Sequence, residues 1–322
     1  MRRLARAFAA SLCLLATAKS APAQDWPRQP IRVIIAFGPG GGTDIVGRIV
    51  ADAMQDRLGK PVVVENKPGA GGIIGNEVVA RATPDGHTLG IMTAGQIIAA
   101  VMRKDMPYDT AVLTPVAQVA SASLLIAARP DFSANDAKEL VGFAKTDPGH
   151  IVFASPGFGA TQHFAGELFK QMAGINLLHV PFRTSPEAIN AVLGHHADVL
   201  FDTVPALIGQ IQSGSLKALA VTGKERFPAM PNVPPAGESG VVPGYDVTSW
   251  YGVFGPPRMP STVVAKLNET LKDIIVDEKV RARLVAVGVV VRGSTAQEFG
   301  QFMADESKRW NAVREAAGIA QQ

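Results

Sequence analysis

The chain has almost no cysteine: Cys13 is the only one among its 322 residues. It lies inside a segment with the features of an export signal, so we expect the mature chain to have no thiol. Without a thiol the mature chain can form no disulfide, and it has neither a cysteine nucleophile nor a thiolate ligand for a metal. Chemistry that depends on sulfur is therefore excluded.

Charge and long apolar runs are also scarce. Charged residues make up only 18% of the chain, and no run of 18 uninterrupted apolar residues occurs after residue 23. A membrane-spanning helix needs about 20 such residues. Several catalytic signatures are missing as well, namely the lysine of a phosphate-binding loop, the Gly-x-Ser-x-Gly of many serine hydrolases and the His-x-x-His or His-x-x-x-His spacing of metal sites.

The first 23 residues predict a secretory signal. Arg2, Arg3 and Arg6 form a basic start, an apolar stretch continues to Ala18, and small residues precede a cleavage point after Ala23. The apolar stretch is too short to span a bilayer. We therefore expect export to the periplasm, with the signal peptide cleaved near Ala23.

Removal of this segment changes the sign of the net charge. The chain carries 31 Lys and Arg against 28 Asp and Glu, and residues 1–23 contain four of the basic residues and none of the acidic ones. The remainder has 27 basic and 28 acidic residues, a balance of −1. The basic isoelectric point therefore comes largely from the signal, and nucleic-acid binding is not indicated.

Short β-branched runs alternate with amphipathic helices through the rest of the chain, which predicts parallel sheets with helical crossovers. Two such α/β units predict two lobes with a ligand cleft between them. The expected strands are 31–37, 61–65, 88–93, 116–128, 151–154, 177–181, 199–201, 216–222 and 247–254, and the expected helices are 43–58, 72–81, 135–145, 161–172, 186–193, 262–276 and 295–317.

Three glycine-rich loops, at 37–44, 66–72 and 154–161, each follow a predicted strand and open a helix. Glycine lets the backbone approach a ligand, and the first N–H groups of a helix have no intrahelical partner, so such a turn can hold an anion without a basic side chain. Thr43 and Thr161 are suited to donate hydroxyl groups or to cap their helices. One such loop is more often only a capped turn, but three favour a shared anion pocket.

The sequence does not match the patterns of more specific cofactor and metal sites. The first loop resembles a dinucleotide-binding fingerprint, and Glu65 ends the next strand at a suitable distance, but Thr43 replaces the third glycine. Exported proteins rarely use diffusible NAD, so no cofactor is expected. The adjacent His195 and His196 project in different directions and indicate a solvated turn rather than a metal site.

Three single residues have two interpretations each. Asp202 ends an apolar strand, where its carboxylate is equally suited to accept hydrogen bonds from a ligand or to hold a neighbouring loop. Gln96 follows the third strand and is equally suited to face the cleft or to cap a turn. His163 lies in the first turn of a predicted helix, where a structural role is favoured over ligand contact.

Longer motifs run through the whole mature chain in a fixed order. They are Gly-Gly-Gly-Thr-Asp at 40–44, Val-Val-Glu-Asn-Lys-Pro-Gly-Ala-Gly-Gly at 63–72, Pro-Asp-Gly-His-Thr-Leu at 84–89, His-Phe-Ala-Gly-Glu-Leu-Phe at 163–169, His-Val-Pro-Phe at 179–182, Asp-Val-Leu-Phe-Asp at 198–202, Leu-Lys-Ala-Leu-Ala-Val-Thr at 216–222 and the segments 250–256 and 309–318. In this order they resemble the Bug-type periplasmic solute-binding receptors of tripartite tricarboxylate transporters.

The resemblance implies a type II periplasmic binding-protein fold, with a signal peptide at 1–23, a first lobe of 24–122 plus 248–322 and a second lobe of 123–247. Two hinge segments are expected near 120–128 and 245–255. Such receptors are not enzymes, and they hold a ligand carboxylate mostly with backbone N–H groups, hydroxyls and waters. The expected ligand-binding residues, including Gln96 from its place after a strand, are Gly41, Gly42, Thr43, Asp44, Ala70, Gly71, Gln96, Ser155, Gly159, Ala160, Thr161 and Asp202.

The chain departs from the family pattern near the expected pocket. Residues 183–185 are Arg-Thr-Ser where Lys-Gly-Gly is usual, and residues 160–162 are Ala-Thr-Gln where hydroxyl-rich runs are frequent. Arg183 is suited either to pair with a second carboxylate or to point to solvent. The ligand is therefore predicted only as a small mono- or dicarboxylate, captured for inner-membrane transporter subunits.

Two other functions are compatible with the same sequence. One is an exported α/β enzyme acting on a small organic acid, for which Asp44, His163 and Asp202 are the candidate catalytic groups, although no motif joins them. The other is a sensory adaptor that presents its ligand to a membrane kinase.

Overall fold

The computed structural model describes residues 26–228, 230–316 and 321. The predicted signal peptide, with Cys13 and the cleavage point at Ala23, lies outside these residues. Within the described ranges, no helix combines the length and the apolar character needed to cross a membrane.

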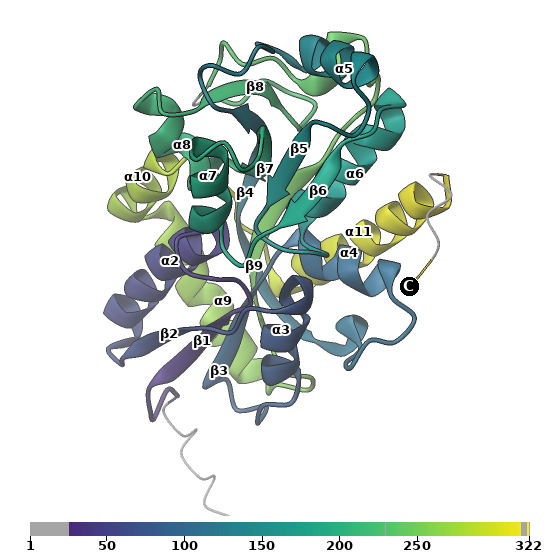
Figure 1. Ribbon diagram of the computed structural model, residues 1–322. Coiled ribbons are helices and arrows are strands. Elements are labelled where there is room, and N and C mark those ends of the chain that lie inside the picture. Colours follow the sequence, from purple (N-terminus) through teal and green to yellow (C-terminus); the bar gives the residue numbers. More distant parts are fainter. Residues whose placement is uncertain (1–25, 229, 317–320, 322) are drawn as a thin grey trace, which may run out of the picture.

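Ten strands of the described chain form one curled, mixed sheet whose two halves are built alike (Figure 1). In the first half β1 pairs in parallel with β2 and β3, and in the second β5 pairs in parallel with β6 and β7. The two-lobed α/β fold is thereby confirmed. The strands are β1 Ile31–Ile35, β2 Val62–Asn66, β3 Thr88–Met92, β4 Thr114–Ala128, β5 Val152–Ser155, β6 Leu178–Pro181, β7 Val199–Thr203, β8 Lys217–Val221, β9 Thr248–Gly255 and β10 Val290–Val291.

Helices cover both faces of the sheet. In α2 the side chains of Val46, Ile49, Val50, Ala53 and Met54 form one stripe that is buried against the first half, as the helical period requires. The helices are α2 Gly42–Leu58, α3 Ile73–Ala80, α4 Ala94–Met102, α5 Ala137–Thr146, α6 Thr161–Ala173, α7 Ser185–Leu193, α8 Val204–Gln212, α9 Ser261–Val276, α10 Glu278–Ala286 and α11 Ala296–Ala316.

Helices α4, α8 and α10 were not predicted. Most residues of α4 are buried, so its sequence lacks the polar face by which an amphipathic helix is recognised. In α8, Pro205 indicated a loop, yet it occupies the first turn of the helix, where a fixed φ and a missing N–H are tolerated. Both errors concern the cleft, because α4 and α8 begin at its edge.

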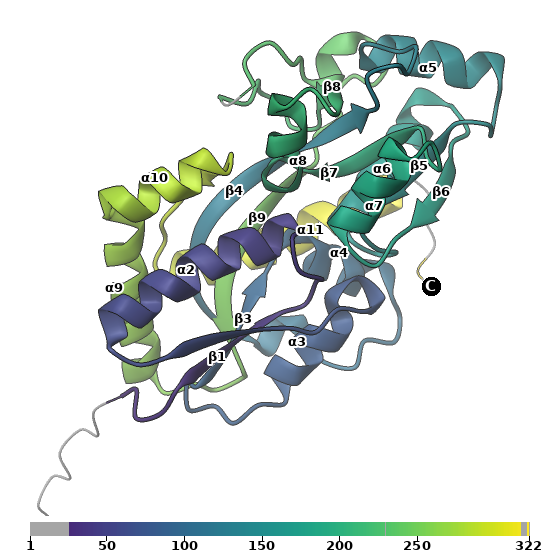
Figure 2. The ribbon, with the colours of Figure 1, turned by 60° about the vertical axis from the view of Figure 1, so that its left-hand side comes forward.

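The two halves are joined by β4, which changes partners along its length (Figure 2). Residues 114–123 pair with β9, whereas residues 124–128 pair with β7 and β8. Across the cleft α2 packs against α8, and α4 packs against α6. The change of partner falls within the expected hinge segment 120–128.

Thr222 connects two chain segments at this point. Its fully buried hydroxyl donates to the Val247 carbonyl at 2.6 Å and accepts from the Leu124 N–H at 3.0 Å. The Val247 N–H donates in turn to the Thr222 carbonyl at 2.9 Å. One side chain therefore holds together the two segments that pass between the halves.

We expect Thr222→Val, which keeps the shape but removes the hydroxyl, to lower the free energy of unfolding by about 1–3 kcal/mol, because it leaves buried backbone groups without partners. Urea denaturation measures this loss.

Thr270→Val is the matched control. Thr270 is also buried, but its hydroxyl donates only to the Lys266 carbonyl of its own helix, at 2.8 Å. A loss at Thr270 equal to that at Thr222 would contradict a linking role for Thr222.

Candidate functional site

A small cavity of about 20 Å³ lies between the two halves. This is space for about one water molecule. No charged side chain lines the cavity; its polar groups are hydroxyls, one amide and backbone. The lining residues are Phe37, Gly38, Gly41, Gly42, Thr43, Thr93, Pro156, Thr161, Gln162, Thr184, Ser185, Thr203 and Ser249.

Five helices begin at this cavity, two from the first half and three from the second. Two of them are capped by a side chain: Thr93 accepts from an N–H of α4, and Thr184 accepts from an N–H of α7. The other three, α2, α6 and α8, have no side-chain cap. Gly41 and Ala160, the N-cap residues of α2 and α6, have no side-chain oxygen with which to cap.

Three uncapped helix starts meet at this uncharged cavity, and their geometry is suited to an anion. The first N–H groups of each helix lack intrahelical partners, and the helix dipole adds a partial positive charge. Hydroxyls from both halves, on Thr43, Thr161, Ser185 and Ser249, are buried around the same space and can donate to the anion. The arrangement suits a carboxylate, which accepts several hydrogen bonds at once.

Asp202 lies directly behind this cavity and is fully buried. Its Oδ1 accepts from the Thr203 N–H at 2.7 Å and from Gln162 Nε2 at 3.1 Å, while Oδ2 has no hydrogen-bond partner among the described residues. Burial raises the pKa of Asp202, although polar neighbours, Ser185 and Gln162 among them, oppose the shift. The two oxygens therefore differ: Oδ1 holds a loop, and Oδ2 has no partner in the described part of the chain.

The carboxylate of Asp44 points into its own loop. It accepts from the Gly40 N–H at 3.0 Å, from Arg48 Nε at 3.0 Å and from Asn66 Nδ2 at 2.8 Å. Burial by itself would raise the pKa of Asp44, but these hydrogen bonds lower it. Asp44 thus fixes the glycine loop before α2 and does not line the cavity.

Only some of the other expected residues line the small cavity. Gln96 accepts from the Thr93 N–H and hydroxyl, both at 2.7 Å, and forms the capping box of α4. The Ser155 hydroxyl lies 2.8 Å from His179 Nε2, below the loop that precedes α6. Ala70 and Gly159 line a larger cavity, described below. Of the expected set, Gly41, Gly42, Thr43 and Thr161 line the small cavity.

Sequence reasoning missed several lining hydroxyls. Thr93 follows β3 and Thr203 ends β7, but the helices that they precede were not predicted. Residues 184–187, Thr-Ser-Pro-Glu, carry the signature of a capped helix start, and the predicted helix 186–193 omitted its cap, Thr184. No local signal marks Ser249, which reaches the cavity from β9.

Close backbone contacts show that the two halves are nearly closed on each other. A Cβ added to Gly42 would lie 2.3 Å from Thr203 Oγ1, and one added to Gly71 would lie 2.8 Å from the Gly159 carbonyl carbon. Each pair joins one half to the other. Glycine is required at these positions because the halves approach so closely.

Comparison with known proteins places the chain among solute receptors. The family model of the tripartite tricarboxylate transporter family receptor matches residues 46–319. The periplasmic binding protein BugD shares 35% sequence identity with this chain. Its structure superposes with a TM-score of 0.88, over 92% of this chain and 100% of the BugD chain. A Rhodopseudomonas palustris protein solved with adipate is 29% identical (TM-score 0.87; 92% and 99% covered), and MatC of that organism with bound malate is 30% identical (TM-score 0.84; 89% and 99% covered).

We expect Gly42→Ala to hold the halves apart, because the new methyl group would overlap the Thr203 hydroxyl across the cleft. Small-angle scattering should show a larger radius of gyration, and the melting temperature should fall.

The control is Gly142→Ala on α5, where a methyl group meets no atom within 4 Å. Alanine should stabilise that helix by about 0.5–1 kcal/mol. If Gly42→Ala leaves the radius of gyration unchanged and stabilises the protein as much as Gly142→Ala does, the contact across the cleft is not tight.

Asp202→Asn tests the buried carboxyl. A pKa raised in the folded state means that the Asp202 contribution to stability is present below the unfolded pKa and is lost as pH rises through the folded pKa. We therefore expect Asp202→Asn to melt at a higher temperature than the wild type at pH 8, with a smaller difference at pH 5.

Asp273→Asn on the exposed surface of α9 serves as the reference and should show no such trend. A difference at Asp202 that narrows with rising pH would contradict the direction of the pKa shift.

Proposed function

The chain belongs to the tripartite tricarboxylate transporter receptor family, and we propose that it captures a small mono- or dicarboxylate in the periplasm for the membrane subunits of such a transporter. The family consists of solute receptors rather than enzymes. Export by the signal at 1–23, with cleavage near Ala23, is part of this proposal.

The observation that carries the proposal is the meeting of three uncapped helix starts, α2, α6 and α8, at a cavity without charged side chains. A cation would meet the positive ends of the helix dipoles there, and a neutral apolar molecule would leave the N–H groups unpaired. A carboxylate satisfies both requirements. The bound acids of the two R. palustris neighbours, adipate and malate, are dicarboxylates and support this class.

Capture requires the halves to open, because the space between them now holds about one water molecule. We propose that lobe 1 (24–122 plus 248–322) and lobe 2 (123–247) rotate about β4 and the segment that leads into β9. The ligand would complete the contacts of α2 on one side and of α6 and α8 on the other. It therefore favours the closed arrangement, in which all three helix starts reach it.

Arg183 and Asp202, both considered for ligand contact, differ in their positions. Arg183 is exposed and does not line the small cavity. Asp202 offers the unpartnered Oδ2, and burial raises the pKa of Asp202, which favours the neutral carboxyl that can donate a hydrogen bond to a ligand carboxylate. We propose Asp202 as the group that distinguishes one end of the ligand.

A thermal-shift screen tests this function. After unfolding and refolding to remove any bound acid, malate or adipate should raise the melting temperature, since a ligand at one hundred times its Kd adds about 2.7 kcal/mol to the stability of the folded state. Failure of every small organic acid to shift the midpoint would refute carboxylate capture.

Thr161→Ala should weaken the binding of the same acid by about tenfold or more, the usual effect of losing a hydrogen bond to a charged group. Thr146→Ala, at an exposed site on α5, should leave the affinity unchanged. Isothermal titration compares the two variants, and wild-type affinity in Thr161→Ala would remove this hydroxyl from the site.

A further inference from the structure

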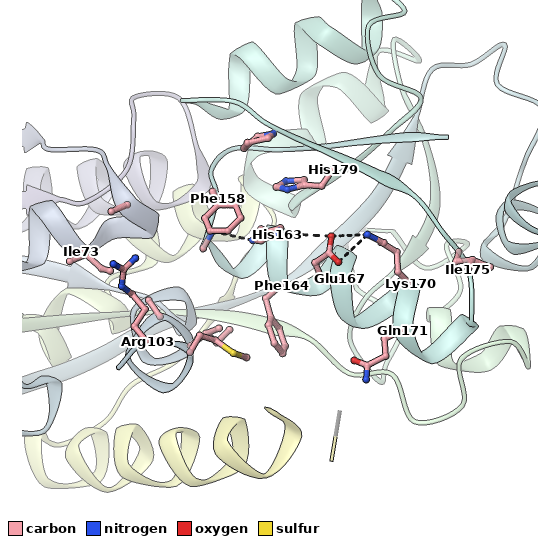
Figure 3. A pocket seen from close by; sticks show the side chains of 16 residues that line it. Ile73, Arg103, Phe158, His163, Phe164, Glu167, Lys170, Gln171, Ile175 and His179 are labelled. Carbon is pink, nitrogen blue, oxygen red and sulfur yellow. Dashed lines mark hydrogen bonds and ion pairs between the residues drawn. The ribbon is translucent and has the colours of Figure 1, made fainter. Parts of the chain in front are cut away.

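A second and much larger cavity lies between α3 and α4 of the first half and α6 and β6 of the second (Figure 3). Its volume is about 890 Å³, in the range of cavities that hold small organic ligands. It shares no lining residue with the small cavity. We call it the side groove.

The walls of the side groove are largely apolar, and they come from both sides of the cleft. An organic molecule in the groove would therefore touch both halves at once. The main apolar side chains are Ile73, Ile98 and Met102 from the first half and Phe158, Phe164 and Ile175 from the second.

The charged groups of the groove leave one cation unpaired. Glu167 is neutralised by Lys170, whose Nζ lies 3.0 Å from each carboxylate oxygen. Arg103 is exposed and forms no ion pair within the described chain. Figure 3 shows Arg103 beside Ile73 at one end of the groove and Lys170 at the other. An anionic group therefore has one evident partner, at the Arg103 end.

Stacked rings form one side of the groove. His163 stacks on His179 at 4.1 Å between ring centres, and Phe158 covers His163 at 4.6 Å. Burial lowers the pKa of His163, and burial with neighbouring positive charge lowers the pKa of His179 to about 3. Both imidazoles are therefore neutral near pH 7. Phe158 is 53% exposed, so its ring is available to a ligand.

This stack is poorly arranged to bind a metal, although ligand atoms of His163, Glu167 and His179 lie within 4.8 Å of one another. The two imidazole planes are only 14° apart, so their in-plane lone pairs do not converge on one point. The Gly159 N–H donates to His163 Nδ1 at 3.1 Å, which places the proton of the neutral ring on Nε2, the atom that faces Glu167. The stacked rings of Phe158, His163 and His179 instead form an uncharged aromatic surface.

We propose that the side groove is a second ligand site, for an amphipathic organic acid with an apolar, preferably aromatic body and one anionic group. The body would lie on Met102, Phe158 and Phe164, and the anion would pair with Arg103. Because the walls belong to both halves, the ligand binds best when the halves are closed. Its binding should therefore strengthen the binding of a carboxylate at the small cavity, and the reverse. This coupling rests on the proposed function, whereas the site itself does not.

The probe is 1-anilinonaphthalene-8-sulfonate, which has an aromatic body and one anion and is far too large for the small cavity. Fluorescence titration of the full mature protein should show saturable binding at one site. Arg103→Glu should weaken it about tenfold or more, since the anion then faces a like charge. Phe158→Ala should weaken it about threefold or more, through the loss of ring contact.

Lys104→Glu is the matched control: it makes the same charge change one residue away, on an exposed side chain that does not line the groove. It should change the probe affinity by less than about twofold, because exposed charges are screened by solvent and salt. Equal effects of Arg103→Glu and Lys104→Glu, or unchanged binding in both Arg103→Glu and Phe158→Ala, would overturn the site.

Titration of the probe in the presence of saturating malate or adipate tests the coupling. We expect the probe to bind about fivefold more tightly or better, the lower end of usual allosteric effects. Competitive displacement of the probe would overturn the inference of two sites, because the groove would then be an extension of the carboxylate pocket. If the acids bind but leave the probe affinity unchanged, the coupling is wrong and the groove site stands. If the acids do not bind at all, the proposed function fails, and the groove variants still decide the site.

Discussion

The arrangement of the small cavity depends on unpaired backbone N–H groups at helix starts. The helices α2, α6 and α8 begin at one cavity, and none of them is closed by a side-chain cap. Buried donors without partners are costly, so the closed arrangement is complete only when an acceptor occupies the space. The absence of charged side chains from the lining strengthens this dependence, because recognition then falls to backbone dipoles and hydroxyls whose positions are fixed by the fold.

The proposed capture also requires that the helix starts separate and meet again, and the pairing of the sheet is compatible with such a movement. A single strand, β4, pairs with one set of strands over 114–123 and with another over 124–128. Thr222 fastens β4 to the chain that leads back into β9. In the proposed hinge motion, rotation about these two adjacent segments would change the distance between the halves and preserve the pairing inside each half. The small residues at the contact, Gly42 and Gly71, then allow the halves to approach until backbone meets side chain or backbone.

The side groove follows from the same architecture. Because α4 and α6 come from different halves, the space between them depends on the position of the halves, as the small cavity does. The two cavities differ in chemistry: one is small and lined by polar groups, and the other is large, apolar and bordered by Arg103. If both cavities bind ligands as proposed, the closed form is favoured in two ways, by an anion at one cavity and by an apolar body at the other.

The sequence by itself determined the alternating strands and helices, the glycine loops at strand ends and the family. These features are local: β-branched runs, helical periods and loop motifs carry their meaning within a few residues. The tertiary structure decided which polar groups remain available. Asp44 is hydrogen-bonded by Arg48 and Asn66, and Gln96 by Thr93. Thr203, at the end of strand β7, and Ser249, on strand β9, are brought to the cavity by the fold. The availability of a donor or acceptor depends on partners far away in the chain, and only the folded arrangement of both halves specifies them.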